Sequence, residues 1–490
     1  MIDGHPDDAV ALISRGRPTT YGALRDQVGS LRGGLVGLDI APGERVAILC
    51  GNSRYFVVSY LAIVGVGAVA VPLNPTSPPP ELAREITAVG AVAVVVEPVA
   101  AAAWSDIAEA CPSVRVVVAA DQSGIEGAVG LDELLAHTPV PVVDVEPDTL
   151  AVLIFTSGTA GSPRAAMLSH GNLLANHRQT RSAAAAMVPG DVVFGVLPLN
   201  HIFGLNVVLG LALSRGATVL LIQRFDPATA LETIRERSVT AIVGAPPMWV
   251  AWSQFADAPA DAFASVRLAI TGAAKMPEDA IRRLQERFGL SLAEGYGLTE
   301  ASPSVTSSVG LPLRPGSVGK VLAGMQVRLV DEDGDDVPAG DPGEIWVKGP
   351  NVFLGYLDDP EATAKALTED GWLRTGDIAV TDAEGYLYLV DRAKDLIIVS
   401  GFNVYPAEVE DVLARHPGVE EVAVVGVAHP HTGEAVKAYV VQSPGVHLDE
   451  EQLIGYVKAN LARYKAPSKI LFVDELPRGL GGKLLRRELR

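Results

Sequence analysis

Cysteine is scarce in this sequence of 490 residues, which contains only Cys50 and Cys111. Two isolated cysteines supply neither a disulfide framework nor the clustered spacing of a zinc site. We therefore expect both to be packing residues. The amino terminus, MIDGHPDD, is acidic and lacks the basic and then apolar pattern of an export signal, which favours a cytoplasmic protein.

Apolar runs long enough to span a membrane are also absent, although 48% of the residues are hydrophobic. The run from Tyr60 to Leu73 ends in a Pro-Leu-Asn-Pro turn, and the run from Ala88 to Trp104 is broken by Glu97 and Pro98. A spanning helix needs about 20 consecutive apolar residues. We therefore predict no transmembrane segment and assign both runs to a buried α/β core.

Basic residues are outnumbered, with 39 Lys and Arg against 58 Asp and Glu, a net charge of −19. This balance argues against nucleic acid or an anionic membrane surface as a partner. The carboxyl end is different, because residues 463–490 hold eight basic and three acidic residues, a local balance of +5. Such an end could lie over an anionic ligand, or it could be a solvated basic tail.

Helical patterns alternate with short strands rich in valine and alanine over residues 1–150, and a second series of the same kind follows to about residue 290. This alternation predicts βαβ units and largely parallel sheets. From about 316 to 389, short alternating strands are separated by turns such as DEDGDD, which indicates a small antiparallel element. The charged sequence at 391–395 marks a boundary before a compact α+β region.

The predicted fold is therefore α/β. A large N-terminal domain, residues 1–391, holds two βαβ-type subdomains and a small β-barrel-like element. A small α+β domain, residues 392–490, follows it.

A loop rich in glycine and hydroxyl groups follows the strand-like run LAVLIF at 150–155. Backbone N–H groups and hydroxyls in such a loop can cradle a polyphosphate, and the charge of Arg164 can reinforce them. An ordinary surface turn has the same composition, so the loop alone does not decide between the two interpretations. The candidate phosphate ligands are Thr156, Ser157, Gly158, Thr159, Gly161 and Arg164.

The sequence GYGLTE at 295–300 supplies a second candidate. Thr299 can hydrogen-bond a phosphate, and Glu300 can hold Mg²⁺, which prefers carboxylate and phosphate oxygens. The ring of Tyr296 could stack on a base. A Gly-Tyr-Gly turn is otherwise an ordinary loop.

Three further residues fit a nucleotide site. Asp377, in RTGD, can accept hydrogen bonds from both hydroxyls of a ribose, although an aspartate in such a turn is more often a cap. Arg392 could be a second sugar contact or the surface partner of Asp391. Lys483, in GGK, could stabilise a phosphorus transition state, or it could lie in an exposed tail.

Taken in order, these motifs resemble the adenylate-forming superfamily, which includes acyl-CoA synthetases, adenylation domains of peptide synthetases and firefly-type luciferases. The resemblance covers about residue 21 to the end of the chain. The motifs that carry it are FTSGTAGSPRAAMLSHGN, PLNHIFG, TGAAKMP, EGYGLTE, WLRTGD, DRAKDLIIVSGFNVYPAEVE and GGKLLRREL.

The resemblance implies two half-reactions, formation of an acyl-adenylate from a carboxylate and MgATP, and then transfer of the acyl group to a thiol, usually that of CoA. It places the β- and γ-phosphates of ATP on residues 156–164, and phosphate and Mg²⁺ on Thr299 and Glu300. The remaining implied roles are adenine binding by Gly272, Ala273, Ala274, Tyr296 and Gly297, ribose binding by Asp377 and Arg392, and adenylation by Lys483.

The resemblance also implies a mobile small domain that swings about a hinge, here Lys394. This motion withdraws Lys483 and presents the loop containing Gly401 to a tunnel for the thiol. His201, in PLNHIFG, would gate that tunnel, although a lone histidine is more often a satisfied core residue.

Two departures from the family pattern concern the phosphate loop. Ala160 replaces a common threonine, and Arg164-Ala165 replaces the usual Lys-Gly. Arginine keeps the charge but has a planar fork, and alanine removes backbone freedom. The terminal arm lacks a threonine that is common before Gly-Lys. We expect an active enzyme whose release of pyrophosphate differs from that of its relatives.

CoA is the favoured acceptor, because residues 355–375 show no insertion of the kind carried by acyl-AMP ligases that load a carrier protein. A luciferase-like oxygenase or a non-catalytic nucleotide-binding protein would also fit these motifs. Pro163 breaks the spacing of a P-loop and excludes that class of NTPase. A homodimer is left open.

The acyl pocket is expected at residues 201–206, 243–249 and 295–297, with Met248 and Trp249 as walls. These windows hold no charged residue, which favours an aliphatic or aromatic monocarboxylate.

Overall fold

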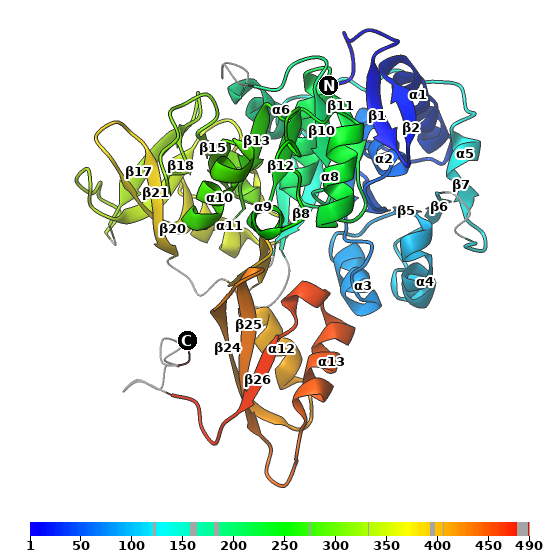
Figure 1. Cartoon of the computed structure of the whole chain (residues 1–490). Helices are drawn as coiled ribbons and strands as arrows, with labels where there is room; N and C mark the ends of the chain where they lie inside the picture. Colours follow the sequence, from blue (N-terminus) through cyan, green and yellow to red (C-terminus); the bar gives the residue numbers. More distant parts are fainter. Residues whose placement is uncertain are drawn as a thin grey trace.

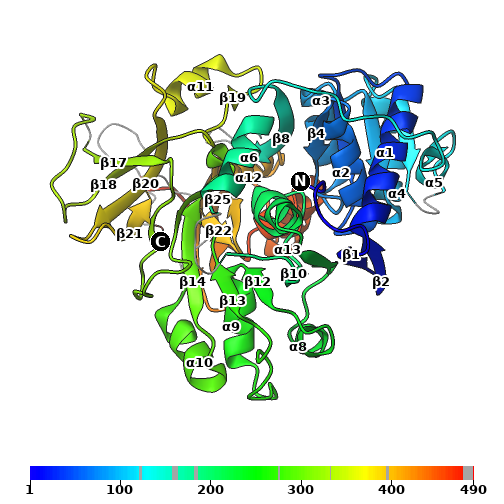
Figure 2. The same ribbon diagram turned by 90° about the horizontal axis from the view of Figure 1, so that it is seen from above.

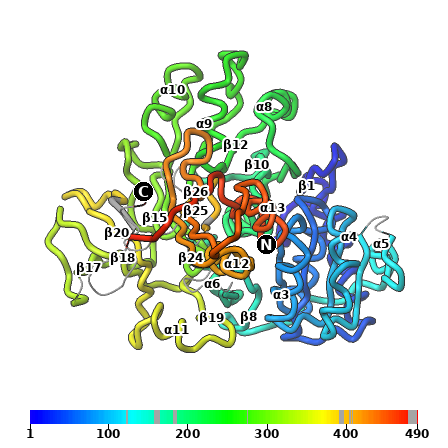
Figure 3. The backbone as a smooth tube through the Cα atoms, turned by 90° about the horizontal axis from the view of Figure 1, so that it is seen from below, coloured from blue at the N-terminus to red at the C-terminus, as the bar shows by residue number. Residues whose placement is uncertain are grey.

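The computed structural model describes residues 1–120, 124–156, 164–180, 186–273, 276–331, 333–392, 397–404, 406–477 and 489. A large body holds the first part of the chain, and a small C-terminal domain lies beneath it (Figure 1). Viewed from below, the small domain lies across the middle of the large one (Figure 3).

One mixed sheet of the large domain has the strand order β19-β9-β8-β4-β3-β5-β6-β7. The strands β4, β3, β5 and β6 pair in parallel, and β8 and β9 form an antiparallel hairpin beside them. These strands are β3 (Arg45–Leu49), β4 (Val69–Pro72), β5 (Ala93–Val96), β6 (Val116–Ala119), β7 (Val129–Gly130), β8 (Leu150–Thr156), β9 (Arg164–Ser169) and β19 (Gly355–Tyr356).

The helices of this half are amphipathic or wholly apolar, as a sheet with covered faces requires. In α2 almost every residue is buried, and the side chain of Ser53 caps its first turn by accepting a hydrogen bond from Phe56 N at 3.2 Å. The helices are α1 (Tyr21–Gly37), α2 (Arg54–Gly65), α3 (Pro79–Ala88), α4 (Pro98–Ile107), the short η1 (Ala108–Ala110) and α5 (Leu131–Leu134).

A second mixed sheet has the order β16-β15-β14-β13-β12-β10-β11-β1-β2. It lies beside the first sheet when the molecule is seen from above (Figure 2). Its strands are β1 (Val10–Ser14), β2 (Arg17–Thr20), β10 (Val192–Gly195), β11 (Thr218–Leu221), β12 (Ala241–Gly244), β13 (Leu268–Thr271), β14 (Leu292–Gly297), β15 (Ser304–Ser307) and β16 (Lys320–Val321).

The elements between these strands are mainly helical. They are α6 (His170–Gln179), the π-helix η2 (Phe203–Leu211) with its continuation α7 (Ala212–Ser214), α8 (Pro227–Glu236), α9 (Pro246–Gln254), α10 (Glu278–Phe288) and the short η3 (Thr299–Ala301).

An antiparallel sheet of order β17-β18-β20-β21 completes the large domain, as the change of period at residue 316 predicts. Its strands are β17 (Gln326–Val330), β18 (Gly343–Lys348), β20 (Leu373–Thr381) and β21 (Leu387–Arg392), with α11 (Pro360–Ala366) between β18 and β20.

The small domain has its own sheet and apolar core. Its elements are β22 (Ile397–Val399), β23 (Phe402–Val404), α12 (Pro406–Ala414), β24 (Val419–His429), β25 (Gly433–Gln442), α13 (Glu450–Asn460), the short η4 (Arg463–Lys465) and β26 (Lys469–Phe472). The predicted hinge, Lys394, falls between β21 and β22 and lies outside the described residues.

Two elements of the second series end earlier than the sequence pattern predicts, a helix over residues 172–186 and a strand over residues 192–199. The helix expected over 172–186 is α6, which begins at His170 because Ser169 and Asn172 form a capping box, and it ends at Gln179. The strand expected over 192–199 ends at Gly195. Cys50 and Cys111 are buried, as expected. Within the described ranges, no helix is long and apolar enough to cross a membrane.

Candidate active site

The phosphate loop is described only at its two ends. Thr156 ends β8 and Arg164 begins β9, and the two are paired across the hairpin. The Thr156 hydroxyl donates to the carbonyl of Arg164 at 3.5 Å. Ser157, Gly158, Thr159 and Gly161 lie outside the described residues.

Arg164 and Glu300 line one cavity and are linked through Tyr356. The guanidinium Nε of Arg164 donates to Asp359 Oδ2 at 2.8 Å, and the guanidinium carbon lies 5.7 Å from the centre of the Tyr356 ring. The Tyr356 hydroxyl donates to Glu300 Oε1 at 2.7 Å. The structure therefore joins the candidate phosphate ligand and the candidate Mg²⁺ ligand, which are far apart in sequence. Tyr356 was not predicted.

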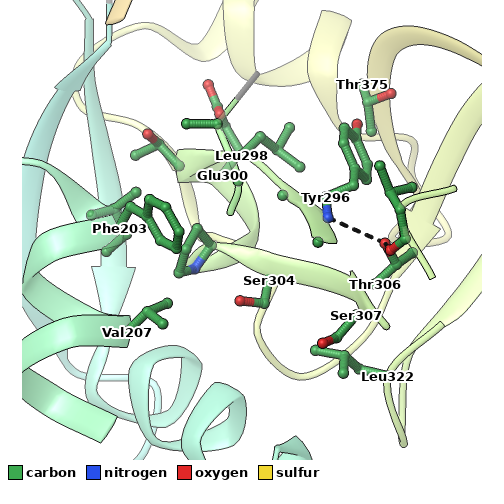
Figure 4. Close-up of a pocket in the computed structure, with 18 of the residues that line it drawn as sticks. Phe203, Val207, Tyr296, Leu298, Glu300, Ser304, Thr306, Ser307, Leu322 and Thr375 are labelled. Carbon is green, nitrogen blue, oxygen red and sulfur yellow. Dashed lines mark hydrogen bonds between the residues drawn. The ribbon is translucent and has the colours of Figure 1, made fainter. Parts of the chain in front are cut away.

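Tyr296 and Asp377 form a second link across the cavity. The Tyr296 hydroxyl donates to Asp377 Oδ2 at 2.7 Å. The Tyr296 amide donates to Thr306 Oγ1 at 3.2 Å, as Figure 4 shows. Asp377 is also the cross-strand neighbour of Arg392 in the β20–β21 pair. The expected adenine and ribose residues are thus adjacent.

The glycines of these motifs allow close approach of chain segments. A Cβ atom on Gly297 would lie 2.2 Å from the carbonyl oxygen of Pro303, and one on Gly272 would lie 3.1 Å from Phe203 Cζ. Ala273, which follows Gly272, has a φ of +70°, in the left-handed region that costs a non-glycine residue conformational energy. Ala274 lies outside the described residues.

A loop of the small domain reaches the same cavity. Gly401 has a φ of +84°, and a Cβ atom there would lie 3.3 Å from Ala245 Cβ and 3.6 Å from Ala273 Cβ. The ring of Phe402 meets His201 edge to face, with centroids 6.1 Å apart. The structure therefore brings this loop against His201.

His201 lines the cavity as a neutral ring. Its Nδ1 accepts a hydrogen bond from the amide of Phe203 at 3.2 Å, which places the proton of the neutral ring on Nε2. Burial lowers the pKa of His201 to about 4. Lys394 and Lys483 lie outside the described residues.

The cavity has a volume of about 1250 Å³ and joins the nucleotide candidates to an apolar wall. Ser304 and Thr306, which follow GYGLTE in the chain, add hydroxyls beside that wall (Figure 4). The apolar wall consists of Phe203, Val207, Leu211, Leu268, Ile270 and Val309.

Met248 and Trp249, expected as pocket walls, do not line the cavity. Trp249 is fully buried and packs against Trp252, with ring centroids 5.3 Å apart. The sequence does not distinguish an apolar side chain that lines a pocket from one that packs in the core. On α9, Met248 and Trp249 are buried in the core. The lining also includes Glu294 and Lys320, charged residues that lie outside the predicted windows.

Glu300 fits a magnesium ligand by its chemistry, since its carboxylate lines the cavity beside Thr299. A protein cage for a metal is not seen, because the described residues contain no group of three or more histidine, cysteine or acidic side chains that could hold an ion.

Family models match most of the chain. The AMP-binding enzyme model matches residues 2–357, and the model of the AMP-binding enzyme C-terminal domain matches residues 408–483.

Curated relatives match over nearly their whole length. A feruloyl-CoA synthase from Amycolatopsis sp is 37% identical, with 98% of this chain and 95% of the relative covered. A long-chain-fatty-acid–CoA ligase from Escherichia coli O6:H1 is 35% identical, with 99% and 91% covered.

Solved structures also match nearly the whole chain. The amide bond synthetase McbA from Marinactinospora thermotolerans has a TM-score of 0.92 at 33% identity, with 100% of this chain and 98% of that chain covered. A malonyl-CoA ligase with methylmalonyl-CoA and AMP bound has a TM-score of 0.82 at 32% identity, with 97% and 98% covered. ATP-bound MatB from Rhodopseudomonas palustris has a TM-score of 0.75 at 34% identity, with 100% and 97% covered.

The chain therefore belongs to the AMP-binding enzyme family, in the acyl-CoA synthetase branch of the adenylate-forming superfamily.

Proposed function

We propose that this member of the branch activates an apolar or aromatic monocarboxylic acid with ATP and transfers the acyl group to CoA. The observation that carries the proposal is one cavity that joins Tyr296, Asp377 and Glu300 to the apolar wall and to the loop at Gly401. Residues 1–391 would hold the substrates, and residues 392–490 would supply the lid.

In the first half-reaction, a carboxylate oxygen attacks the α-phosphorus of ATP, and the bond to pyrophosphate breaks. Arg164, with the loop before it, would hold the β- and γ-phosphates, while Asp377 and Arg392 would hold the ribose. Lys483 would stabilise the charge that develops on phosphorus. Mg²⁺, held by Glu300 and phosphate oxygens, would neutralise the phosphates when bound.

In the second half-reaction, the thiol sulfur bonds to the acyl carbon, AMP leaves with the electron pair, and the thiol proton passes to water. Phe402, the residue after Gly401, meets His201 where the thiol would enter. The higher TM-score against the ligase holding methylmalonyl-CoA and AMP, compared with ATP-bound MatB, supports assigning the present domain arrangement to this step.

The proposed acid class depends on the apolar wall. Phe203, Val207 and Leu211 come from one face of the π-helix η2, and Leu268 and Ile270 come from β13. An aliphatic chain or an aromatic ring fits such a wall, and the hydroxyl of Ser304 could hydrogen-bond a polar substituent on it. The feruloyl-CoA and long-chain relatives support the same class.

Amide formation is a second candidate, favoured by the TM-score of 0.92 against an amide bond synthetase. The acyl-adenylate would be the same, and an amine would replace CoA as the acceptor.

Acid-dependent ATP–pyrophosphate exchange across fatty, aromatic, dicarboxylic and amino acids tests the proposal. We expect exchange with fatty or aromatic monocarboxylates, and acyl-CoA when CoA is added. Exchange confined to dicarboxylates or amino acids would contradict the acid class. If acyl-AMP accumulates in the presence of CoA but reacts with an added amine to form an amide, the acceptor is an amine and not CoA.

A further inference from the structure

A buried group of charged side chains joins the two domains away from the cavity. Glu81 and Glu85 lie one turn apart on α3 of the large domain, and Glu408 and Lys465 belong to α12 and η4 of the small domain. All four are at most 8% exposed. We call them the interdomain ion cluster.

Direct bonds hold this cluster across the domain boundary. Lys465 Nζ donates to Glu81 Oε1 and to Glu408 Oε1, each at 2.9 Å. The other oxygen of Glu81, Oε2, accepts a hydrogen bond from the backbone amide of Ala462 at 2.8 Å. Glu81 therefore satisfies one buried charge and one buried backbone donor of the small domain.

Aromatic contacts connect the cluster to the active site. Tyr464, the neighbour of Lys465, stacks on Phe402 with ring centroids 4.5 Å apart. Phe402 in turn meets His201, which lines the cavity. The segment fixed by Glu81 thus supports the loop that reaches the candidate thiol entrance.

Glu81 depends on the present domain arrangement for its partners, whereas Lys465 does not. Lys465 and Glu408 belong to one domain and can stay paired when that domain rotates. Glu81 would be left without the Lys465 ammonium and the Ala462 amide. Both bonds exist only while the domains keep this arrangement, and bonds to ionised groups are stronger than neutral ones, so they favour this arrangement over ones in which α3 faces water.

We propose that Glu81 and Lys465 are positioning residues for thioester formation and are dispensable for adenylation. The inference rests on the proposed two-step function. It adds that the second step requires an ion pair that touches neither substrate.

Glu81→Ala tests the inference, because it removes the interdomain partner without altering the small domain. We expect acid-dependent ATP–pyrophosphate exchange to stay within about twofold of wild type. The single-turnover rate constant for converting preformed acyl-AMP and CoA to acyl-CoA should fall tenfold or more. Thr87→Ala, at an exposed position on the same helix, is the matched control and should change neither rate.

Lys465→Met should produce the same selective loss, and the double variant should lose little more than the worse single variant, since both single variants break the same interdomain pair. Thermal melting checks that each variant folds. If Glu81→Ala does not fold, Glu81→Gln replaces it, because glutamine keeps the size and removes the charge.

Equal losses in both half-reactions, or no loss in either, would overturn the inference. A wild-type protein without exchange would instead refute the proposed function, and exchange without consumption of CoA would refute the acceptor.

Discussion

The structure explains how Arg164, an unusual residue of the phosphate loop, is held in place. Its guanidinium is bonded to Asp359 and lies over Tyr356, so it is held at the cavity wall by contacts that a lysine would make differently. Ala165, in place of the usual glycine, is buried in β9, where an extended backbone does not require glycine. The departure at Ala165 is thus accommodated by the strand.

For Arg164, we predict that alanine raises the KM for ATP about tenfold or more, since a hydrogen bond to a charged group contributes about 1.5–3 kcal/mol. Arg164→Lys should raise it about two- to fivefold, because the charge remains and the planar fork is lost. ATP-dependent exchange rates give both values. Asp359→Asn keeps the helix cap and is the matched control, with a smaller change expected. Unchanged ATP affinity and turnover in Arg164→Lys would contradict a special role for arginine.

Tyr356 offers a test of how Glu300 is oriented. Phenylalanine keeps the ring against Phe353 and Arg164 but removes the hydroxyl that donates to Glu300. We predict that Tyr356→Phe raises the Mg²⁺ concentration for half-maximal exchange by up to about tenfold. Tyr386→Phe removes a hydroxyl that bonds the carbonyl of Pro312 and is the control. An unaltered Mg²⁺ dependence would show that Glu300 needs no such support.

At the scale of elements, α6 holds the segments around the active site in place through hydrogen bonds of buried side-chain amides. Asn176 Nδ2 donates to the carbonyl of Ser304, and Gln179 Nε2 donates to Asn351 Oδ1 at 2.9 Å. Asn351 Nδ2 donates to the carbonyls of Ala301 and Ser304 at 2.6 and 3.0 Å. The helix that follows the phosphate hairpin therefore holds the segment immediately after Glu300.

Asn351→Ala should lower the free energy of unfolding by about 2–4 kcal/mol, since it removes the partner of the Ala301 carbonyl and of the Gln179 amide, both buried. Urea unfolding measures the loss. Gln254→Ala, an exposed amide at the end of α9, should change stability by less than about 0.5 kcal/mol. A loss at Asn351 as small as that of the control would mean that other groups or water replace these bonds.

Local sequence signals predicted most elements, because burial period and turn residues determine where a strand or helix forms. Strand β8 before the phosphate loop, the antiparallel sheet after residue 316 and the α+β character of the small domain follow from such signals. Pairings between segments that are distant in the chain do not follow from local signals. Strand β1 pairs with β11 of the other half of the large domain, and no local pattern specifies that pairing.

The candidate site shows the same division. The sequence motifs predict Asp377 and Tyr296 as nucleotide ligands, and the structure adds the hydrogen bond between them. Of the η2 face that forms the pocket wall, only Phe203 lies within the predicted windows. Val207 and Leu211 do not, because the run FGLNVVLGL has Asn206 as its one polar residue and no polar face that would indicate its orientation. Glu81 and Lys465 are 384 residues apart, and each resembles an ordinary surface charge in the sequence.

At the scale of the whole molecule, the interdomain ion cluster couples domain arrangement to protonation. Charged or titratable groups face one another from α3 (Glu81, Arg84, Glu85), α12 (Glu408) and η4 (Tyr464, Lys465). Burial raises the pKa of Glu85 well above its ordinary value and also raises the pKa of Glu408. Beside Tyr464, Glu81 and Glu408, the pKa of Lys465 is raised, despite burial, so its charge persists.

The direction in which pH changes the stability of this domain arrangement follows from the proton that Glu85 binds. In this arrangement the carboxyl stays protonated to a higher pH than it would in water, so the arrangement binds more protons than one in which α3 is exposed. Its stabilisation is complete below the ordinary pKa of 4.5 and is lost as pH rises toward the raised value. Higher pH should therefore disfavour the arrangement assigned to thioester formation, while adenylation is unaffected by this group.

We predict that, as pH rises above the ordinary glutamate pKa of 4.5, the ratio of the thioester single-turnover rate to the exchange rate falls more steeply in wild type than in Glu85→Gln. Glutamine is neutral at every pH, so the variant cannot lose the proton, whereas ionisation of the CoA thiol affects both proteins equally. Measuring both half-reactions across this range, with Thr87→Ala as the control, gives the comparison. Parallel profiles for wild type and Glu85→Gln would show that Glu85 carries no proton that the domains exchange when they rearrange.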